Sequence, residues 1–292
     1  MTGNKISGKT KICAIIGDPV EHSMSPAMHN AAYKKMGLDY IYLPLLVKSE
    51  HLKPAVEGLR ALNFRGFNVT MPHKVSIIPL LDGLDALAEK IGAVNTVVNE
   101  NGELRGYNTD GLGFLQALLE HGVEPEGKNT VVLGAGGASR AISYVLARRG
   151  ARLTILNRKL ELDWADDIAA FIRRDLGAEV KVMELGFEPL QAALAGADVL
   201  INATSVGMSP DAGKSLVPAE LLRDGLTVCD VIYTPLKTRL LREADAAGCR
   251  IINGVDMLAW QGVLCFEKWT GQPVPLELMR REAIKTLGHY ED

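Results

Sequence analysis

Apolar and polar positions along the chain form two successive series of short β-branched runs, separated by segments with helical spacing. Apolar runs typical of strands in the first series lie at Lys11–Gly17, Tyr40–Leu46, Gly66–Val69 and residues 94–98. Residues 52–62 have helical spacing, Ser25-Pro26 is typical of a helix start with Ser25 as N-cap, and residues 75–91 are expected to be mostly helical. Strands that alternate with helices favour a mostly parallel sheet with crossover helices.

A second series follows a predicted connecting helix at residues 111–121 and a polar Gly- and Pro-containing stretch at residues 122–128. Its strands are expected at residues 131–133, 152–156, 180–183, 199–202, 227–231 and 250–252. The chain then becomes helical at residues 257–269 and again from Leu276. We therefore expect two α/β domains, at residues 1–111 and 112–257, followed by a helical segment at residues 258–292.

Composition and charge limit the kinds of partner that the chain is expected to bind. The 292 residues are 47% hydrophobic and 23% charged, which is ordinary for globular domains, and the net charge of −3 with no long basic block argues against nucleic acid. No apolar stretch reaches the ~20 residues needed to span a bilayer, and the apolar run after Lys11 is too short for a signal peptide. We therefore expect a cytoplasmic protein with no membrane partner, either a monomer or a homodimer.

The cysteines carry no chemical signature. They are far apart in the sequence and show no C-x-x-C spacing: Cys13, Cys229, Cys249 and Cys265. Cys13 and Cys229 lie within apolar runs, where a free thiol behaves as a small hydrophobe. We expect buried free thiols and no metal site.

A glycine-rich turn at the start of the second series predicts a nucleotide site. Thr130-Val-Val-Leu-Gly-Ala-Gly-Gly-Ala-Ser-Arg-Ala141 reads as a strand, a tight turn and a helix start. Glycines there let backbone N–H groups approach a pyrophosphate at the helix N-terminus. Ser139 stands where the usual fingerprint has its third glycine, but the required strand and helix flank the turn.

The end of the next strand indicates which cofactor is used. NAD-selective sites usually place Asp or Glu there to bind the ribose hydroxyls, whereas this chain has Asn157, Arg158 and Lys159. A 2′-phosphate needs positive charge and hydrogen-bond donors, and an arginine supplies both. The sequence therefore favours NADP over NAD; the alternative is a solvated basic turn.

Two polar loops between apolar runs carry groups suited to proton transfer on a polyhydroxylated small molecule. They are Asn68-Val-Thr-Met-Pro-His-Lys74 and Gly106-Tyr-Asn-Thr-Asp-Gly111. A lysine can take up a hydroxyl proton when burial or its neighbours bring its pKa towards the working pH. Lys74 is therefore the candidate base and Asp110 its carboxylate partner, although on this segment alone Lys74 also fits a solvated surface lysine. We expect His73 to pack or cap rather than to catalyse.

The motifs together resemble the shikimate dehydrogenase family, whose members interconvert 3-dehydroshikimate and shikimate. The resemblance covers nearly the whole chain and rests on eight ordered motifs: His22-Ser-Met-Ser-Pro26, Asn68-Val-Thr-Met-Pro-His-Lys74, Gly92-Ala-Val-Asn-Thr96, Tyr107-Asn-Thr-Asp-Gly111, Gly134-Ala-Gly-Gly137, Asn202-Ala-Thr-Ser-Val-Gly-Met208, Asp230-Val-Ile-Tyr-Thr-Pro235 and Met257-Leu-Ala-Trp-Gln261. It implies an N-terminal substrate-binding domain, a Rossmann-type NADP-binding domain, and C-terminal helices that return to the first domain.

The resemblance also implies roles for individual residues. Ser23 and Ser25 would bind the substrate carboxylate, and its hydroxyls or carboxylate would be bound by Asn68, Thr70, Asn95 and Gln261. Lys74 and Asp110 would form the catalytic pair in contact with substrate, and Tyr233 would bind substrate and line the pocket beside the nicotinamide. The residues implied for the cofactor are Gly134, Ala135, Gly136, Gly137, Ala138, Asn157, Arg158, Lys159, Thr204, Ser205, Val231, Gly254 and Met257.

The sequence leaves alternatives open. NADP-using members often have Thr after the Asn-Arg pair, where this chain has Lys159, so NAD use stays possible. Relatives that also oxidise quinate share nearly every motif, so a quinate/shikimate dehydrogenase of broader choice is an alternative. A non-catalytic NADP or metabolite sensor is an alternative from a different class, because a fold does not determine a function.

Overall fold

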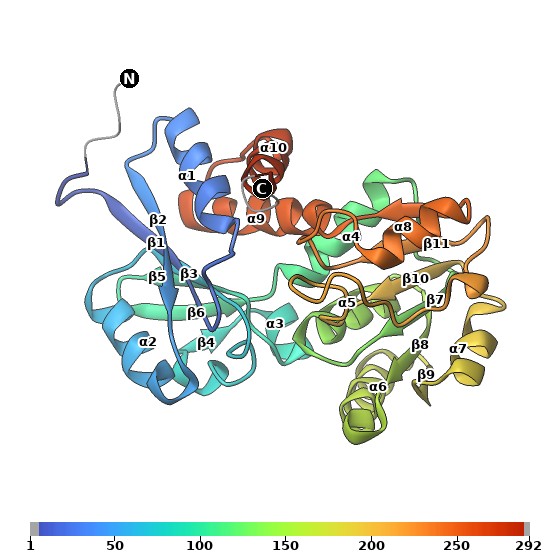
Figure 1. Cartoon of the computed structure of the whole chain (residues 1–292). Coiled ribbons are helices and arrows are strands. Elements are labelled where there is room, and N and C mark those ends of the chain that lie inside the picture. The colour runs from blue at the N-terminus through green and yellow to red at the C-terminus, as the bar shows by residue number, and fades with distance from the viewer. Residues whose placement is uncertain (1–5, 289–292) are drawn as a thin grey trace. The chain divides into compact units, whose positions relative to one another are not determined.

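The computed structural model describes residues 6–288 and divides the chain into two compact units (Figure 1). Within the described residues the first unit comprises residues 6–109 and 259–288, and the second comprises residues 110–258. Residues 1–5 and 289–292, which belong to the expected first domain and the helical segment after it, lie outside the described residues.

The first unit is a six-stranded sheet with helices around it. Its strands are β1 (Lys11–Gly17), β2 (Tyr40–Leu46), β3 (Gly66–Val69), β4 (Gly83–Leu84), β5 (Thr96–Glu100) and β6 (Glu103–Tyr107). Its helices are α1 (Ser25–Lys35), η1 (Ser49–His51), α2 (Leu52–Ala61), η2 (Ile78–Leu80), α3 (Ala86–Ile91), the later part of α9 (Gly254–Thr270), and α10 (Leu276–Leu287). The strand order is β2-β1-β3-β5-β6-β4.

The centre of this sheet forms because its strands are apolar on both faces. The last five residues of β1 and all four of β3 are buried, as expected for parallel strands covered on both sides. One face carries a core that includes Ile16, Phe67 and Val97 of the sheet with Val56 and Leu59 of α2. The other side of the unit holds α1, which packs beside α10 (Figure 1).

The sequence predicted the second half of this sheet less well. The stretch at residues 75–91 is not mostly helical: Pro79 lies in the short η2, and α3 begins only after Asp85, whose carboxylate caps it by accepting from Ala88 N at 2.8 Å. The predicted strand at 94–98 starts two residues later as β5, and β6 was missed. Asn101 and Gly102 both have positive φ, which makes the two-residue turn of a β-hairpin. The sheet is therefore mixed, because β5 runs antiparallel to β3 and β6.

The end of α9 is fixed to this sheet by one large side chain. Trp269 is 1% exposed, and its indole Nε1 donates to the Val97 carbonyl at 3.0 Å. Its own carbonyl accepts from the Arg65 guanidinium at 2.9 Å. The indole lies against Gly66, where a Cβ would overlap both Trp269 Nε1 and the Val97 carbonyl oxygen. A glycine is therefore required at this position for α9 to dock.

The second unit is a parallel six-stranded sheet with the order β12-β11-β10-β7-β8-β9. Its strands are β7 (Asn129–Leu133), β8 (Arg152–Asn157), β9 (Val180–Glu184), β10 (Val199–Asn202), β11 (Thr227–Asp230) and β12 (Arg250–Ile252). Its helices are α4 (Asp110–Glu120), α5 (Gly137–Arg148), η3 (Lys159–Glu161), α6 (Leu162–Leu176), α7 (Phe187–Leu194), η4 (Ala219–Leu221), α8 (Arg239–Ala246) and the start of α9. All six predicted strands are present within two residues of their expected bounds.

This strand order is that of a doubly wound dinucleotide-binding fold, in which the order of strand addition reverses between β7 and β10. Val131 and Leu133 of β7 face the core formed with α7 and α8. Because side chains alternate along a strand, Val132 points to the opposite face, which α5 covers. Ligands of such sheets bind beyond the carboxyl ends of the strands at the reversal point.

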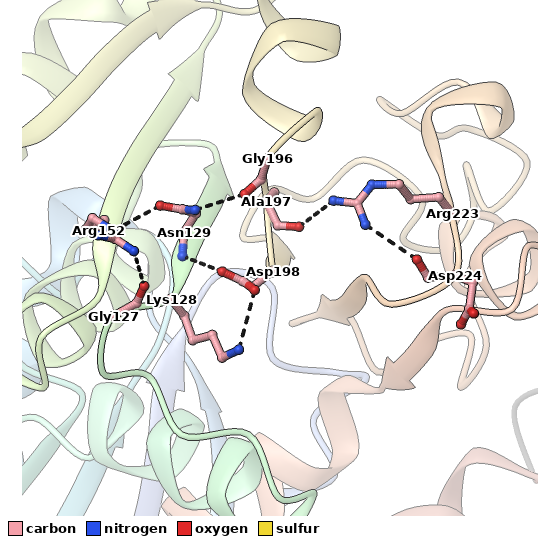
Figure 2. A network of polar contacts seen from close by, with 9 residues as sticks. All are labelled: Gly127, Lys128, Asn129, Arg152, Gly196, Ala197, Asp198, Arg223 and Asp224. Carbon is pink, nitrogen blue, oxygen red and sulfur yellow. Dashed lines mark hydrogen bonds and ion pairs between the residues drawn. The ribbon is translucent and has the colours of Figure 1, made fainter.

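The amino ends of the same strands are joined by a separate polar network (Figure 2). Asp198, just before β10, accepts from Asn129 N at 2.8 Å and from Lys128 Nζ at 3.4 Å. Arg152 donates to the Asn129 amide oxygen at 3.0 Å, and Arg223 donates to the Ala197 carbonyl at 2.7 Å. The backbone N–H of Asn129 is the main reason that the pKa of Asp198 lies below its ordinary value. This network connects β7, β8 and β10 at their amino ends, opposite the carboxyl ends at which ligands of such sheets bind.

Among residues 6–288, no helix combines the length and apolar character needed to cross a membrane.

We expect Gly66→Ala to lower the free energy of unfolding by about 1–3 kcal/mol, because the new methyl group overlaps Trp269 and the β5 backbone. Urea denaturation followed by tryptophan fluorescence measures this loss. Gly58→Ala is the matched control: it lies in α2 with open space around its Cβ position and is expected to stabilise by about 0.5–1 kcal/mol. Equal effects of the two substitutions would contradict the proposed role of Gly66.

Candidate active site

In the first unit, backbone hydrogen bonds bring three polar loops together. Val69 N donates to Asn95 O at 2.8 Å, and Val94 N donates to Lys74 O at 2.7 Å. Asn95 N donates in turn to Tyr107 O at 3.1 Å. The loop after β3, the loop before β5 and the loop after β6 are therefore held as one assembly. This assembly contains the predicted residues Asn68, Thr70, Lys74 and Asn95.

Asn68 is the buried centre of the assembly. It is 4% exposed, and its amide nitrogen donates to Asn95 O and Thr96 Oγ1, both at 3.1 Å. Its amide oxygen accepts from the Tyr42 hydroxyl at 2.6 Å, and the Cys265 thiol lies 3.8 Å from that oxygen. Burial raises the pKa of Tyr42, so the phenol remains a neutral donor. Both amide hydrogens are used inside the protein, so Asn68 has a single, fixed orientation.

Reciprocal hydrogen bonds between Asn95 and Thr109 hold the backbone directly before Asp110. Thr109 N donates to Asn95 Oδ1 at 2.7 Å, and Asn95 Nδ2 donates to Thr109 Oγ1 at 2.9 Å. Asn108 adds a bond from its amide to Ala93 O at 3.0 Å. Asp110 follows directly as the first residue of α4 and is 5% exposed. The sequence placed Thr109 in a polar motif but did not predict its pairing with Asn95, because the two residues are 14 positions apart.

Lys74 lies beside a buried histidine anchor. His73 is fully buried, and its Nε2 lies 2.6 Å from the Val47 carbonyl oxygen; because a carbonyl can only accept, Nε2 is the donor. The backbone N–H of His73 also donates to Thr70 O at 2.9 Å. Lys74 is half-buried at the next position. The structure thus gives His73 the packing role that the sequence favoured.

The other predicted substrate residues of the first unit occupy α1, the loop before it, and α9. The prediction that Ser25 is the N-cap of α1 is wrong by one position: the cap is Met24, and the helix begins at Ser25. Ser25 is buried, and its backbone N–H lies 3.3 Å from the hydroxyl of the half-buried Ser23. Gln261 is 7% exposed and lies one turn before Cys265, on the face of α9 that reaches Asn68.

Thr70 depends on a glycine that the sequence did not single out. Thr70 N donates to Ile16 O of β1 at 2.9 Å, and its side chain is half-buried. Its methyl group lies so close to Gly17, at the end of β1, that a Cβ at residue 17 would overlap it. Gly17 therefore leaves the space in which the Thr70 side chain sits.

In the second unit, the glycine-rich turn lies at the reversal point, between β7 and α5. Gly134 has φ of +94°, and a Cβ there would lie 2.7 Å from Thr204 Cγ2, so the turn requires glycine. The Ser139 hydroxyl donates to Gly134 O at 2.6 Å. Ser139 is fully buried and closes the turn in place of the third glycine of the usual fingerprint. Ala135 is buried, whereas Gly136, Gly137 and Ala138 are exposed or half-buried.

The basic turn at the end of β8 also contains Glu161, an acidic residue to which the sequence motifs gave no role. Asn157 is 6% exposed, and its amide nitrogen donates to the Glu161 carbonyl at 2.6 Å. The Arg158 guanidinium forms an ion pair with the Glu161 carboxylate. This pairing raises the pKa of Arg158 and lowers that of Glu161, so both groups are charged. Lys159 is exposed.

A buried carboxylate joins two further loops at the carboxyl ends of β10 and β11. Asp230 is 2% exposed and accepts from Thr238 Oγ1 at 2.7 Å, Asn202 Nδ2 at 3.0 Å and Ile232 N at 3.0 Å. The Asn202 amide oxygen accepts from Thr204 Oγ1 at 2.7 Å. Burial raises the pKa of Asp230 to about 6, although its three donors oppose the change. The predicted residue Thr204 is thereby held in place, with Ser205 exposed beside it.

The last predicted cofactor residues lie where the 231–233 segment meets the start of α9. Gly254 N donates to Ile232 O at 3.2 Å, and a Cβ at Gly254 would overlap the carbonyl oxygens of Val231 and Ile232. Met257 is buried one turn later. Tyr233 is half-buried, and burial raises the pKa of its phenol.

The four cysteines are free and buried. Within residues 6–288, no three His, Cys, Asp or Glu side chains are grouped so that they could hold a metal ion.

The chain is similar to known proteins over almost all of its length. Family models for the shikimate dehydrogenase substrate binding domain and the shikimate 5′-dehydrogenase C-terminal domain match residues 15–97 and 254–284. A shikimate dehydrogenase (NADP(+)) of Dehalococcoides mccartyi is 49% identical over 92% of this chain and 93% of that protein.

Solved structures agree with this similarity. A shikimate dehydrogenase in complex with NADP+ has a TM-score of 0.91 and 43% identity, covering 97% of both chains. A shikimate 5-dehydrogenase from Listeria monocytogenes in complex with shikimate and NAD has a TM-score of 0.89 and 42% identity, covering 96% of this chain and 98% of that one.

We expect Asp230→Asn to change how stability depends on pH. The pKa of Asp230 is raised from 3.8 to about 6 on folding, so the folded protein binds the extra proton between these values. Stability contributed by that proton is present below pH 3.8 and is lost as the pH rises through 6. The difference of 6 − 3.8 = 2.2 units corresponds to about 3 kcal/mol.

Relative to the unsubstituted protein, Asp230→Asn should therefore gain roughly 3 kcal/mol as the pH rises from 4 to 7, since an asparagine does not ionise. Urea denaturation at a series of pH values measures the difference. Asp245→Asn is the matched control, because Asp245 is an exposed surface residue paired with Lys237. If the stability difference between Asp230→Asn and the unsubstituted protein does not depend on pH, folding does not raise the pKa of Asp230.

Proposed function

This chain belongs to the shikimate dehydrogenase family, and we propose that it catalyses the reversible NADPH-dependent reduction of 3-dehydroshikimate to shikimate. The observation that carries the proposal is the joined set of loops in the first unit. Asn68, Asn95 and Thr109 are held by buried hydrogen bonds in the same assembly as Lys74. A protein that only sensed a metabolite would not need a lysine with proton-transfer chemistry in that assembly.

We assign the substrate to the polar groups of the first unit. Ser23, Ser25 and Thr70 offer hydroxyl donors for a carboxylate, and Gln261 and Asn95 offer amides for hydroxyl groups. Asn68 has both amide hydrogens bound to the protein, so its contribution is to orient its neighbours rather than to donate to the substrate. This assignment differs from the substrate-binding role that the family resemblance implies for Asn68.

The cofactor is assigned to the second unit because its loops fit a dinucleotide phosphate. Gly134 leaves space that a Cβ would fill, and the exposed Gly136 presents backbone at the amino end of α5 for a pyrophosphate. Asn157, Arg158 and Lys159 offer donors and positive charge to a 2′-phosphate. We also assign Thr204, Ser205, Val231, Gly254 and Met257 to the cofactor side of the site, and Tyr233 to substrate beside the nicotinamide. Bound NADPH supplies the hydride that reduces the carbonyl carbon.

Lys74 supplies the matching proton. In the direction of reduction, its ammonium donates a proton to the carbonyl oxygen as that oxygen gains negative charge; in the direction of oxidation, the neutral amine takes the hydroxyl proton back. Asp110 is assigned as the carboxylate of the catalytic pair. The proton and the hydride together account for the two hydrogens added to the carbonyl group.

A matrix of steady-state assays tests the proposed reaction. We expect turnover with shikimate and NADP, followed at the nicotinamide absorbance, and much weaker turnover with quinate. Comparable rates with quinate would assign the protein a broader substrate range. If neither shikimate nor quinate is turned over, the proposed enzyme activity is excluded.

We expect Lys74→Ala to reduce kcat by about 10²–10⁴-fold with a much smaller change in KM for shikimate, because it removes a group that acts in proton transfer. Steady-state kinetics measures both constants. Lys53→Ala removes an exposed lysine of α2 and should leave both unchanged. Retention of most turnover by Lys74→Ala would take the proton-transfer role away from Lys74.

A further inference from the structure

The turn between β8 and α6 satisfies its own donors. Two residues assigned to the 2′-phosphate, Asn157 and Arg158, both bind Glu161: the Asn157 amide donates to its carbonyl at 2.6 Å, and the Arg158 guanidinium pairs with its carboxylate. A carboxylate and a phosphate present the same kind of acceptor oxygens to an arginine. Glu161 therefore already occupies the arginine in the way that a 2′-phosphate would.

The two contacts of Glu161 differ in how easily they can be exchanged. The Asn157 contact uses the backbone of Glu161 and does not depend on its side chain. The Arg158 contact uses the carboxylate of Glu161; the Glu161 side chain is 23% exposed and the Arg158 side chain is 68% exposed. Such an exposed pair contributes little to folding stability, so a ligand can displace it at small cost.

We propose that Glu161 is a specificity-determining residue, whose carboxylate competes with the 2′-phosphate for Arg158 and so reduces the preference of the protein for NADP over NAD. The inference rests on the proposed function, which places the 2′-phosphate at this turn. NADP must displace the carboxylate and brings further negative charge next to it. NAD carries a hydroxyl at the same position and leaves the Arg158–Glu161 pair in place.

The structure offers a closely matched control for a test of this competition. Arg239 Nε pairs with Glu243 Oε1 at 2.7 Å on α8, and Glu243 is 22% exposed, against 23% for Glu161. Each pair joins an arginine to a glutamate within one helical turn. Glu243→Gln therefore changes the net charge and breaks the same kind of ion pair away from the basic turn.

The test measures binding without turnover. Isothermal titration calorimetry of the full chain compares adenosine 2′,5′-bisphosphate, which carries the 2′-phosphate, with adenosine 5′-monophosphate, which lacks it. We expect Glu161→Gln to bind the bisphosphate about 3- to 10-fold more tightly at low ionic strength and the monophosphate with unchanged affinity. The gain should shrink as salt is added, because both the pair and the repulsion are near the surface. Glu243→Gln should match the unsubstituted protein with both ligands.

The outcomes separate this inference from the proposed function. If Glu161→Gln leaves the ratio of the two affinities unchanged, or if Glu243→Gln changes it equally, the inference is wrong even in a protein that turns over shikimate. If the ratio shifts as expected but no shikimate turnover is detected, the competition at Arg158 stands and the proposed activity fails. In an active enzyme, Glu161→Gln should also lower KM for NADP and leave KM for NAD unchanged.

Discussion

The reciprocal hydrogen bonds between Asn95 and Thr109 are the interaction on which the first unit's polar loops depend. Buried amides and hydroxyls must find partners inside the protein, and here each residue satisfies the other. This pairing sets the backbone position from which Asp110 starts α4, and Asn95 also connects to Asn68 through its carbonyl. Chemical groups that would be mobile on isolated loops are thereby preorganised before any ligand arrives.

In the second unit, a buried carboxylate holds the loops together. Asp230 accepts three hydrogen bonds and so joins the loops after β10 and β11, as Asn95 joins loops in the first unit. A carboxylate accepts more hydrogen bonds than an amide, but it must lose its hydration to do so, which is why its pKa is raised. The geometry of the cofactor loops is therefore maintained at some cost in stability at neutral pH.

Sequence periodicity predicted the second unit almost completely, because buried parallel strands are continuous apolar runs between Gly-containing turns. It failed at residues 75–91, where Pro79 and the Asp85 cap interrupt an otherwise helical pattern, and at β6, whose Asn101-Gly102 turn was overlooked. Motifs located Lys74, Asn95 and the Gly134 turn. They did not reveal Tyr42 or the partner of Thr109, because these contacts form only when the folded chain brings distant residues close. They did not reveal Glu161, because its negative charge is opposite to the basic pattern that marked the turn.

The network at the amino ends of β7, β8 and β10 has an evolutionary consequence. Lys128, Asp198 and Arg152 lie at the amino ends of the strands. The glycine-rich turn follows the carboxyl end of β7. Substitutions at the amino ends of these strands can therefore accumulate without changing the loops at their carboxyl ends. A fold divided in this way can acquire a new ligand preference through its loops while the opposite end of the sheet keeps its structure.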